Sequence, residues 1–172
     1  MILRPAATAD IPALSRLATA AFVAKFGHLY AREDLDAFLR DCLSEAALAS
    51  DFADPQQVYR LTESDGALVA FCKISTKCGF PQHARGTRTM ELKQLYTAPD
   101  ATGMGLGAPL MDWAMAELAV RGADEVQLSV YAENDGAQRF YARYGFGKVA
   151  DITFMVGNHV DPEFLFARLL PA

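Results

Sequence analysis

The sequence predicts a single α/β (α+β) domain spanning residues 1–172, a mixed, mostly antiparallel sheet of about seven strands flanked by about four helices. Hydrophobic residues make up 52% of the chain, enough for one core of ordinary size. Short apolar segments with β-branched and aromatic residues alternate with longer segments of helical periodicity. One strand–helix–strand step in the middle predicts the parallel pair, and no repeat or linker divides the chain.

The first half of the chain predicts four strands and two helices. The strands cover residues 2–5, 58–62, 67–75 and 88–97. One helix begins at the capping residue Thr8 and continues to Phe22, and a second follows the apolar period of residues 35–46. An Asp-Gly pair at residues 65–66 predicts a tight hairpin between the second and third strands. Residues 76–87 form a loop.

The second half predicts two helices and three strands. A helix follows the apolar period from Leu106 to Leu118 and stops at an Arg-Gly pair, and another covers residues 134–145. The strands cover residues 125–131, 146–156 and 163–170. Residues 157–162 are expected to be a loop between the last two strands.

Composition limits the classes of function. The formal net charge is −5, which argues against nucleic acid as a partner and fits a cationic small molecule. No apolar run is long enough for a membrane span, and no secretory signal is visible at the N-terminus. The three cysteines are scattered without metal-ligand spacing, so we expect a reduced cytoplasmic setting and no metal. Whether the chain forms a homodimer is left open.

Three glycines, Gly103, Gly105 and Gly107, alternate between a predicted strand and a predicted helix. A helix N-terminus exposes unpaired amides, and glycines before it let these amides surround an anion such as phosphate. The alternative is a tight turn that needs glycine only for its dihedral angles. A dinucleotide fingerprint is met only formally, because the strand stops early, at Thr97, and no acidic residue ends the next strand. A Walker-type loop is excluded, since no Lys-Ser/Thr follows the glycines.

A second motif further along the chain narrows these alternatives. Residues 134–146 match the pattern Asn-x-x-Ala-x-x-Phe-Tyr-x-x-x-Gly-Phe, while residues 102–107 follow the strand and proline of "LYTAPDA". Together the two motifs resemble the GNAT superfamily of acetyl-CoA-dependent N-acetyltransferases, whose pyrophosphate motif is Gln/Arg-x-x-Gly-x-Gly/Ala. The order of the predicted elements is similar to this family over essentially the whole chain.

The resemblance implies acetyl-CoA as co-substrate and a set of residues that contact it. This set is Leu95, Tyr96, Thr97, Thr102, Gly103, Met104, Gly105, Leu106, Gly107, Asn134 and Tyr141. Thr102 departs from the family, which usually has Gln or Arg there, so we expect the backbone amides of residues 103–107 to carry the binding and the affinity to be lower. For Asn134 the alternative is a plain helix N-cap.

Two residues are expected to be catalytic. The resemblance places Tyr141 beside the thioester sulfur as proton donor to the leaving group, and Glu91 on the strand before the cofactor segment as the base. Alternation along that strand places Glu91 on the same side as Leu95 and Thr97. The alternative for Glu91 is an ion pair with Lys93 on a solvated face.

The acceptor substrate is the feature of the reaction that the sequence determines least. Within the superfamily, the segments "FGHLYAREDLDAFL" and "FMVGNHVDPEFLFARLL" resemble the bacterial spermidine/spermine acetyltransferase branch. Glu33, Asp34 and Asp36 can attract a polyamine, although acidic residues in a first helical turn are also favoured by the helix dipole. We therefore expect direct acetyl transfer to a primary amine of a small molecule, such as a polyamine. The alternatives are a protein or peptide N-acetyltransferase and a non-catalytic acyl-CoA-binding module.

Overall fold

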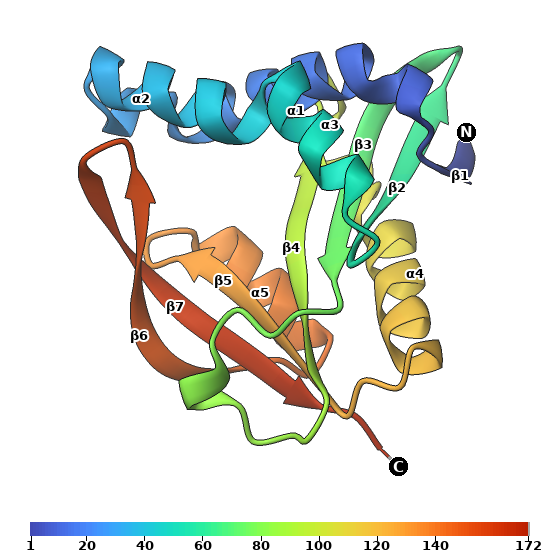
Figure 1. Cartoon of the computed structure of the whole chain (residues 1–172), viewed down its shortest axis with the longest axis vertical. Coiled ribbons are helices and arrows are strands. Elements are labelled where there is room, and N and C mark those ends of the chain that lie inside the picture. The colour runs from blue at the N-terminus through green and yellow to red at the C-terminus, as the bar shows by residue number, and fades with distance from the viewer. Residues whose placement is uncertain (172) are drawn as a thin grey trace.

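The computed structural model describes residues 1–171, which form one seven-stranded sheet with helices packed against it (Figure 1). The strand order is β1-β2-β3-β4-β5-β7-β6, and β4 and β5 are the parallel neighbours. The strands are β1 (Ile2–Pro5), β2 (Gln57–Ser64), β3 (Ala67–Ser75), β4 (Thr89–Thr97), β5 (Glu125–Tyr131), β6 (Gly147–Val156) and β7 (His159–Leu169). The predicted fold class is confirmed.

The helices lie on both faces of the sheet. They are α1 (Ile11–Phe26), α2 (Arg32–Phe38), α3 (Glu45–Ala53), α4 (Gly107–Val120) and α5 (Asp135–Arg143). On one face, Tyr59 of β2 donates a hydrogen bond to Asp51 of α3 (2.6 Å), and α1 packs beside α3. On the other, the next residue, Arg60, lies 5.3 Å from the ring centroid of Trp113 in α4. Tyr144 bonds to the first turns of α4, so α5 shares this side. We call the two sides the α1 face and the α4 face.

Ser44 divides the second predicted helix, residues 35–46, into two. The helix α2 runs into a π-helical turn over Leu39–Leu43, and Ser44 is then extended. Its hydroxyl accepts a hydrogen bond from the amide of Ala47 (3.2 Å), which is the bond of an N-cap. A new helix, α3, therefore begins at Glu45, and the uniform apolar period of the sequence conceals this break. Among residues 1–171, no helix combines the length and apolar character that a membrane-crossing segment requires.

The parallel pairing of β4 and β5 is short. It extends from Thr89 opposite Glu125 to Glu91 opposite Gln127, after which β4 stays paired with β3 alone. Figure 1 shows the two strands diverging from this end. A bulge at Lys93 shifts the register between β3 and β4 and bends β4 at this point. Backbone groups on the β5 side of β4 are thus released from the sheet beyond Glu91.

Two acidic residues at the start of β5 hold the predicted loop of residues 76–87 in place. The side chain of Glu125, which is 0% exposed, accepts hydrogen bonds from the amides of Arg85 (2.7 Å) and Gly86 (2.8 Å) and from the Thr89 hydroxyl (3.0 Å). Asp124 accepts a bond from the amide of the neighbouring Arg88 (2.8 Å). The loop is therefore fixed across the closed end of the β4–β5 pair.

The last strand, β7, begins at His159, four residues earlier than predicted. A two-residue turn at Gly157 and Asn158 replaces the expected loop. The Asn158 amide donates to the carboxylate of Asp34 in α2 (2.8 Å), and a Cβ on Gly157 would lie 2.5 Å from the Asp34 Cα. The tip of the β6–β7 hairpin is thus docked against α2, and one of the predicted acidic patch residues serves this contact.

Replacement of Glu125 by Ala is expected to lower the free energy of unfolding by about 3 kcal/mol, because buried donors of the loop lose a charged acceptor. Urea denaturation followed by circular dichroism measures this change. Glu117→Ala, which removes a surface pair with Arg121 on α4, is the control and costs less than about 0.5 kcal/mol. Equal losses in the two variants would contradict the anchoring role of Glu125.

Candidate active site

The glycine turn between β4 and α4 combines unusual backbone angles with open space. Gly103 and Gly105 have φ angles of +85° and +76°, which residues with a side chain rarely adopt. No atom lies within 4 Å of the position of a Cβ on either glycine. Gly107 is the first residue of α4, so the turn leads into the positive end of the helix dipole. The dihedral angles explain the glycines, and the space above them leaves room for an anion.

A groove of about 350 Å³ lies over this turn on the α4 face. It is lined by Thr97, Ala101, Thr102, Gly103, Gly105, Leu106, Gly107, Ala108, Phe140 and Arg143. The groove thus brings together the predicted glycines, Leu106, Thr97 and Thr102. The other residues of the predicted cofactor set lie outside its lining, and Met104 is 64% exposed.

Arg143 brings to this groove a cation that the sequence analysis did not predict. Its guanidinium is exposed and lies 5.6 Å from the ring centroid of Phe140. Thr102 offers less to an anion in the groove, because its hydroxyl already donates a hydrogen bond to the main-chain oxygen of Ala98 (3.3 Å). In the sequence, Arg143 follows Tyr141 by two residues in "RFYARYGF", and this position could have indicated a cation near the groove. A cation from α5 therefore stands near the turn that has no long polar side chain of its own.

The helix α5 positions Tyr141 and Asn134. Tyr141 packs against Phe140 and Phe146, and burial, followed by the proximity of Cys72 and Tyr96, raises the pKa of its phenol. None of the hydrogen bonds within residues 1–171 involves this hydroxyl. Asn134 is the N-cap of α5, since its side chain accepts from the amide of Ala137 (3.2 Å). The phenol of Tyr141 thus remains a protonated donor at neutral pH.

The structure places Glu91 on the α1 face. Its register partner is Ser75, and the bulge puts it on the side of Gln94 and Tyr96, whereas Leu95 and Thr97 face α4. The predicted shared side with Leu95 and Thr97 is therefore wrong, because one extra residue in a strand reverses the alternation after it.

Glu91 lies beneath the loop of residues 76–87. The residue is 4% exposed, its carboxylate is 3.3 Å from the Lys93 ammonium, and a Cβ on Gly79 would lie 2.4 Å from this carboxylate. Burial raises the pKa of Glu91, while the nearby Lys93 opposes this effect. The predicted ion pair is present, but under the loop rather than on a solvated face.

A row of polar side chains on β5 and β7 is not predicted from the sequence. These residues are Ser129, Tyr131, Asp161 and Glu163. Tyr131 stands opposite Glu163 in the register and packs edge-on against Phe26 of α1 (6.0 Å between ring centroids), so the row lies on the α1 face. Residues 157–162 looked like a loop because of Gly157 and Pro162, and a strand alternation starting at His159 was the signal that could have revealed the row.

The two carboxylates of this row have different partners. Asp161, 3% exposed, accepts a hydrogen bond from the Tyr30 hydroxyl (2.5 Å), and its other oxygen is 3.1 Å from Nε2 of His159. Glu163 accepts a hydrogen bond from the Ser129 hydroxyl. Burial and then the nearby charge of Asp161 raise the pKa of Glu163 to about 7. A carboxyl group of this kind can take and release a proton at neutral pH.

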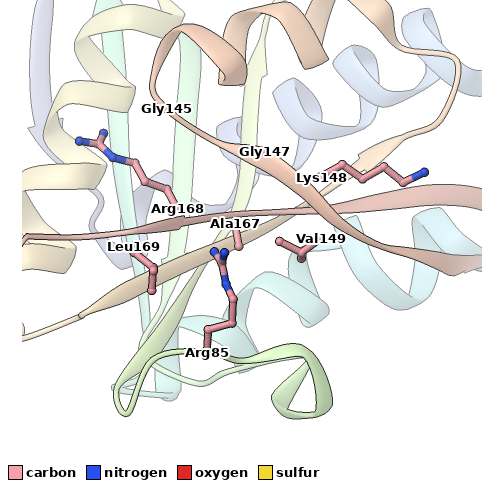
Figure 2. A pocket seen from close by; sticks show the side chains of 8 residues that line it. All are labelled: Arg85, Gly145, Gly147, Lys148, Val149, Ala167, Arg168 and Leu169. Atoms are coloured by element: carbon pink, nitrogen blue, oxygen red, sulfur yellow. The ribbon is translucent and has the colours of Figure 1, made fainter.

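A second groove lies at the other end of β6 and β7, and Figure 2 shows its lining. Its three cations point in different directions and are engaged elsewhere: Arg85 pairs with Glu125 (3.0 Å), Lys148 is 2.8 Å from Asp151, and Arg168 donates to the main-chain oxygen of Tyr144 (2.8 Å). The predicted site residues lie outside this groove, so it is not part of the candidate active site.

Comparison with known proteins agrees with this geometry. The profile of the Acetyltransferase (GNAT) family matches residues 13–146, and the chain belongs to this family. It is 32% identical over 162 residues to an uncharacterized N-acetyltransferase of Mycobacterium bovis, covering 94% of this chain and 98% of that protein. It is also 32% identical over 98 residues to the aminoalkylphosphonate N-acetyltransferase of Salmonella typhimurium, which covers 57% of this chain and 62% of that one.

A solved structure shows the same fold. The PaiA N-acetyltransferase of Thermoplasma acidophilum, in complex with coenzyme A, superposes with a TM-score of 0.79 at 18% identity and covers 98% of both chains. Together with the family match, this establishes the class of the protein. The chain is an acetyl-CoA-dependent N-acetyltransferase.

Proposed function

We propose that this enzyme transfers the acetyl group of acetyl-CoA to a primary amine of a small molecule by direct attack, without an acyl-enzyme. The observation that carries the proposal is the arrangement around the diverging strands β4 and β5. A groove with an anion-binding turn lies on the α4 face, and buried carboxylates lie on the α1 face. The two substrates therefore reach the opening between the strands from opposite sides.

The α4 face fits coenzyme A. When bound, acetyl-CoA supplies an activated thioester. The amides of residues 103–107 and the Arg143 guanidinium hold its pyrophosphate, since amides at a helix N-terminus and a cation both favour an anion. The backbone of residues 95–97, released from β5, holds the pantetheine arm, and one amide of this segment polarises the thioester carbonyl. Met104 and Asn134 remain predicted contacts at the edge of this surface.

Tyr141 is the proton donor to the departing sulfur. Its raised pKa keeps the phenol protonated at neutral pH, and no group among residues 1–171 forms a hydrogen bond with its hydroxyl and competes for the proton. A donor of this kind stabilises the leaving thiolate as it forms. Glu91, the base predicted from the sequence, is enclosed by the loop and by Lys93.

A small amine suits the acceptor side. The two segments that resemble the spermidine/spermine acetyltransferase branch meet there, where Tyr30 bonds to Asp161 and Asn158 bonds to Asp34. The carboxylates of the buried Asp161 and the half-buried Glu163 favour a cation, and the net charge of −5 agrees with this preference. The Salmonella relative is named for a small amine, an aminoalkylphosphonate. Within this class we propose a polyamine as the acceptor.

A CoA-release assay with a panel of amines tests the proposed function. The panel contains spermidine, spermine, an aminoalkylphosphonate and peptides with a free N-terminus or an internal lysine. We expect saturable release with a small amine and little with peptides. Release with peptides alone would support a protein acetyltransferase instead, and tight CoA binding without turnover on any amine would support a non-catalytic acyl-CoA-binding module.

The substitution Gly105→Val is expected to raise the Kd for CoA about tenfold or more, because a β-branched residue cannot adopt φ of +76° without strain and fills the cradle. Isothermal titration calorimetry measures the affinity. Gly66→Val is the matched control: Gly66 has φ of +77° and open space around it, but lies in the β2–β3 turn. An undiminished affinity in Gly105→Val would remove the phosphate cradle from the proposal.

Arg143→Ala is expected to raise the Kd for CoA about tenfold, the size typical of one lost charge-assisted contact. The dependence of the affinity on salt concentration should also weaken. Arg139→Ala, which removes an exposed cation of the same helix outside the groove, is the control. Similar losses in both variants would indicate a general electrostatic effect rather than a contact by Arg143.

Tyr141→Phe is expected to lower kcat about 10²-fold while the Kd for CoA stays nearly constant, because a general acid acts on the leaving group during the reaction. Steady-state kinetics and calorimetry provide the two values. Tyr144→Phe is the control, since that hydroxyl bonds to α4 rather than facing the opening. Unchanged turnover in Tyr141→Phe would show that another group protonates the sulfur.

A further inference from the structure

We infer that Glu163 of β7 is the general base that takes the proton of the acceptor amine, and this inference rests on the proposed function. The groove, the glycine turn and Tyr141 lie on the α4 face, so the base for an amine that arrives from the other side is expected on the α1 face. Both Glu91 and Glu163 are there. Their positions along the strands distinguish them.

Glu163 lies at the open end of the diverging strands. Its register partner is Tyr131, four residues beyond Gln127, at which the β4–β5 pairing ends. Four residues of extended chain span about 13 Å. Glu91 lies at the closed end, beneath the loop, whereas Glu163 lies toward the segment of residues 95–97 that is proposed to hold the thioester.

Tyr96 lies on the α1 face of β4, beyond the end of the β4–β5 pairing. The pKa of its phenol is raised by burial and then by the charge of Glu163. The pKa of Tyr141 is raised by burial, by Cys72 and by Tyr96. The charge of Glu163 thus acts on the strand segment of residues 95–97, which is proposed to hold the thioester.

The surroundings of Glu163 leave it free to exchange a proton. Ser129 of β5 donates a hydrogen bond to it, Tyr131 and Tyr96 are its neighbours on β5 and β4, and Ile152 stands opposite it on β6. Within residues 1–171, the charged group that acts on it most strongly is Asp161. No Lys or Arg in this described part of the chain is close enough to hold its charge, in contrast to the Lys93 pair of Glu91.

Asp161 has a different role, as a positioning residue. Tyr30, from the connection between α1 and α2, and His159 occupy both of its oxygens. Burial raises the pKa of Glu163, and the charge of the nearby Asp161 raises it further, to about 7. The two neighbouring carboxyl groups thus have different environments: Asp161 has a partner on each oxygen, whereas the raised pKa of Glu163 suits a proton acceptor.

The proton balance of the transfer agrees with this assignment. An ammonium nitrogen carries three protons, and the amide product keeps one. Glu163 takes the first before the attack and passes it to solvent, which frees the nitrogen lone pair. The N–C bond then forms and the C–S bond breaks as Tyr141 gives its proton to the sulfur. The second nitrogen proton leaves to solvent, from which Tyr141 is reprotonated.

The substitution Glu163→Gln tests the assignment. We expect kcat/KM at pH 7.5 to fall about 10²–10³-fold, the range of a lost general base, with unchanged CoA affinity. The kcat/KM of the wild type should rise with pH with an apparent pKa near 7, and this rise should disappear in Glu163→Gln. Glu117→Gln, on the surface of α4, should keep both. Glu91 is the rival candidate for the base, so the same profile is measured for Glu91→Gln. If the rise of kcat/KM with pH disappears in Glu91→Gln but persists in Glu163→Gln, the inference is overturned.

A measurement without substrates makes the test independent of turnover. Because the folded state binds a proton at Glu163 more tightly than the unfolded chain, ionisation of Glu163 lowers stability as the pH rises from 4.5 to about 7. The Tm of Glu163→Gln should therefore rise relative to wild type across this interval. A Tm difference independent of pH would contradict the inference.

The two proposals fail in different ways. No CoA release by the wild type with any amine refutes the proposed function and the base with it. Release by the wild type together with an unchanged pH profile in Glu163→Gln refutes the base alone.

Discussion

The early end of the parallel pairing between β4 and β5 determines the geometry of the site. Parallel strands that stay paired have no free backbone groups between them, so nothing can bind there. Here the pairing ends after Glu91 and Gln127, and a bulge at Lys93 bends β4 while it stays bonded to β3. Beyond Glu91, β4 is therefore hydrogen-bonded to β3 along one edge, while the backbone groups on its other edge are free to bind a ligand.

The same bulge distributes β4 side chains between the two faces of the sheet. Without the extra residue, Glu91 would share a side with Leu95 and Thr97. With it, Thr97 lines the groove of the α4 face and Tyr96 faces the α1 side. The closed end of the pair is stabilised separately, by Glu125 and Asp124, whose bonds to the loop amides keep the divergence from spreading. A rigid closed end and a free open end thus coexist in one strand pair.

Much of the cofactor side follows from the sequence because it depends on short local patterns. The angles of Gly103 and Gly105, the cap at Asn134 and the stop of α4 near Gly122 are each determined within a few residues. The bulge at Lys93 and the break at Ser44 leave the apolar pattern intact, so pattern alone did not reveal them.

The acceptor side is formed by contacts between distant segments, which local patterns do not encode. Asp34 and Asn158 are 124 residues apart in the chain, and Tyr30 and Asp161 are 131 apart. Pro162 also made the start of β7 look like a loop, which concealed Asp161 and Glu163. A proline is tolerated there because the pairing of β7 with β5 ends at Glu163, and the carbonyl of Pro162 still accepts from the amide of Ala132 (3.0 Å).

In the proposed function, these distant contacts are where acceptor preference resides. The connection between α1 and α2 reaches β7 through Tyr30, and α2 fixes the tip of the β6–β7 hairpin through Asp34. A change in either segment moves Asp161 relative to Glu163, and the charge of Asp161 adds to the effect of burial on the pKa of Glu163. In the proposed mechanism, these segments therefore influence both which amine reacts and the pH at which it reacts. The glycine turn and α4, which make none of these contacts, can stay the same while acceptors differ.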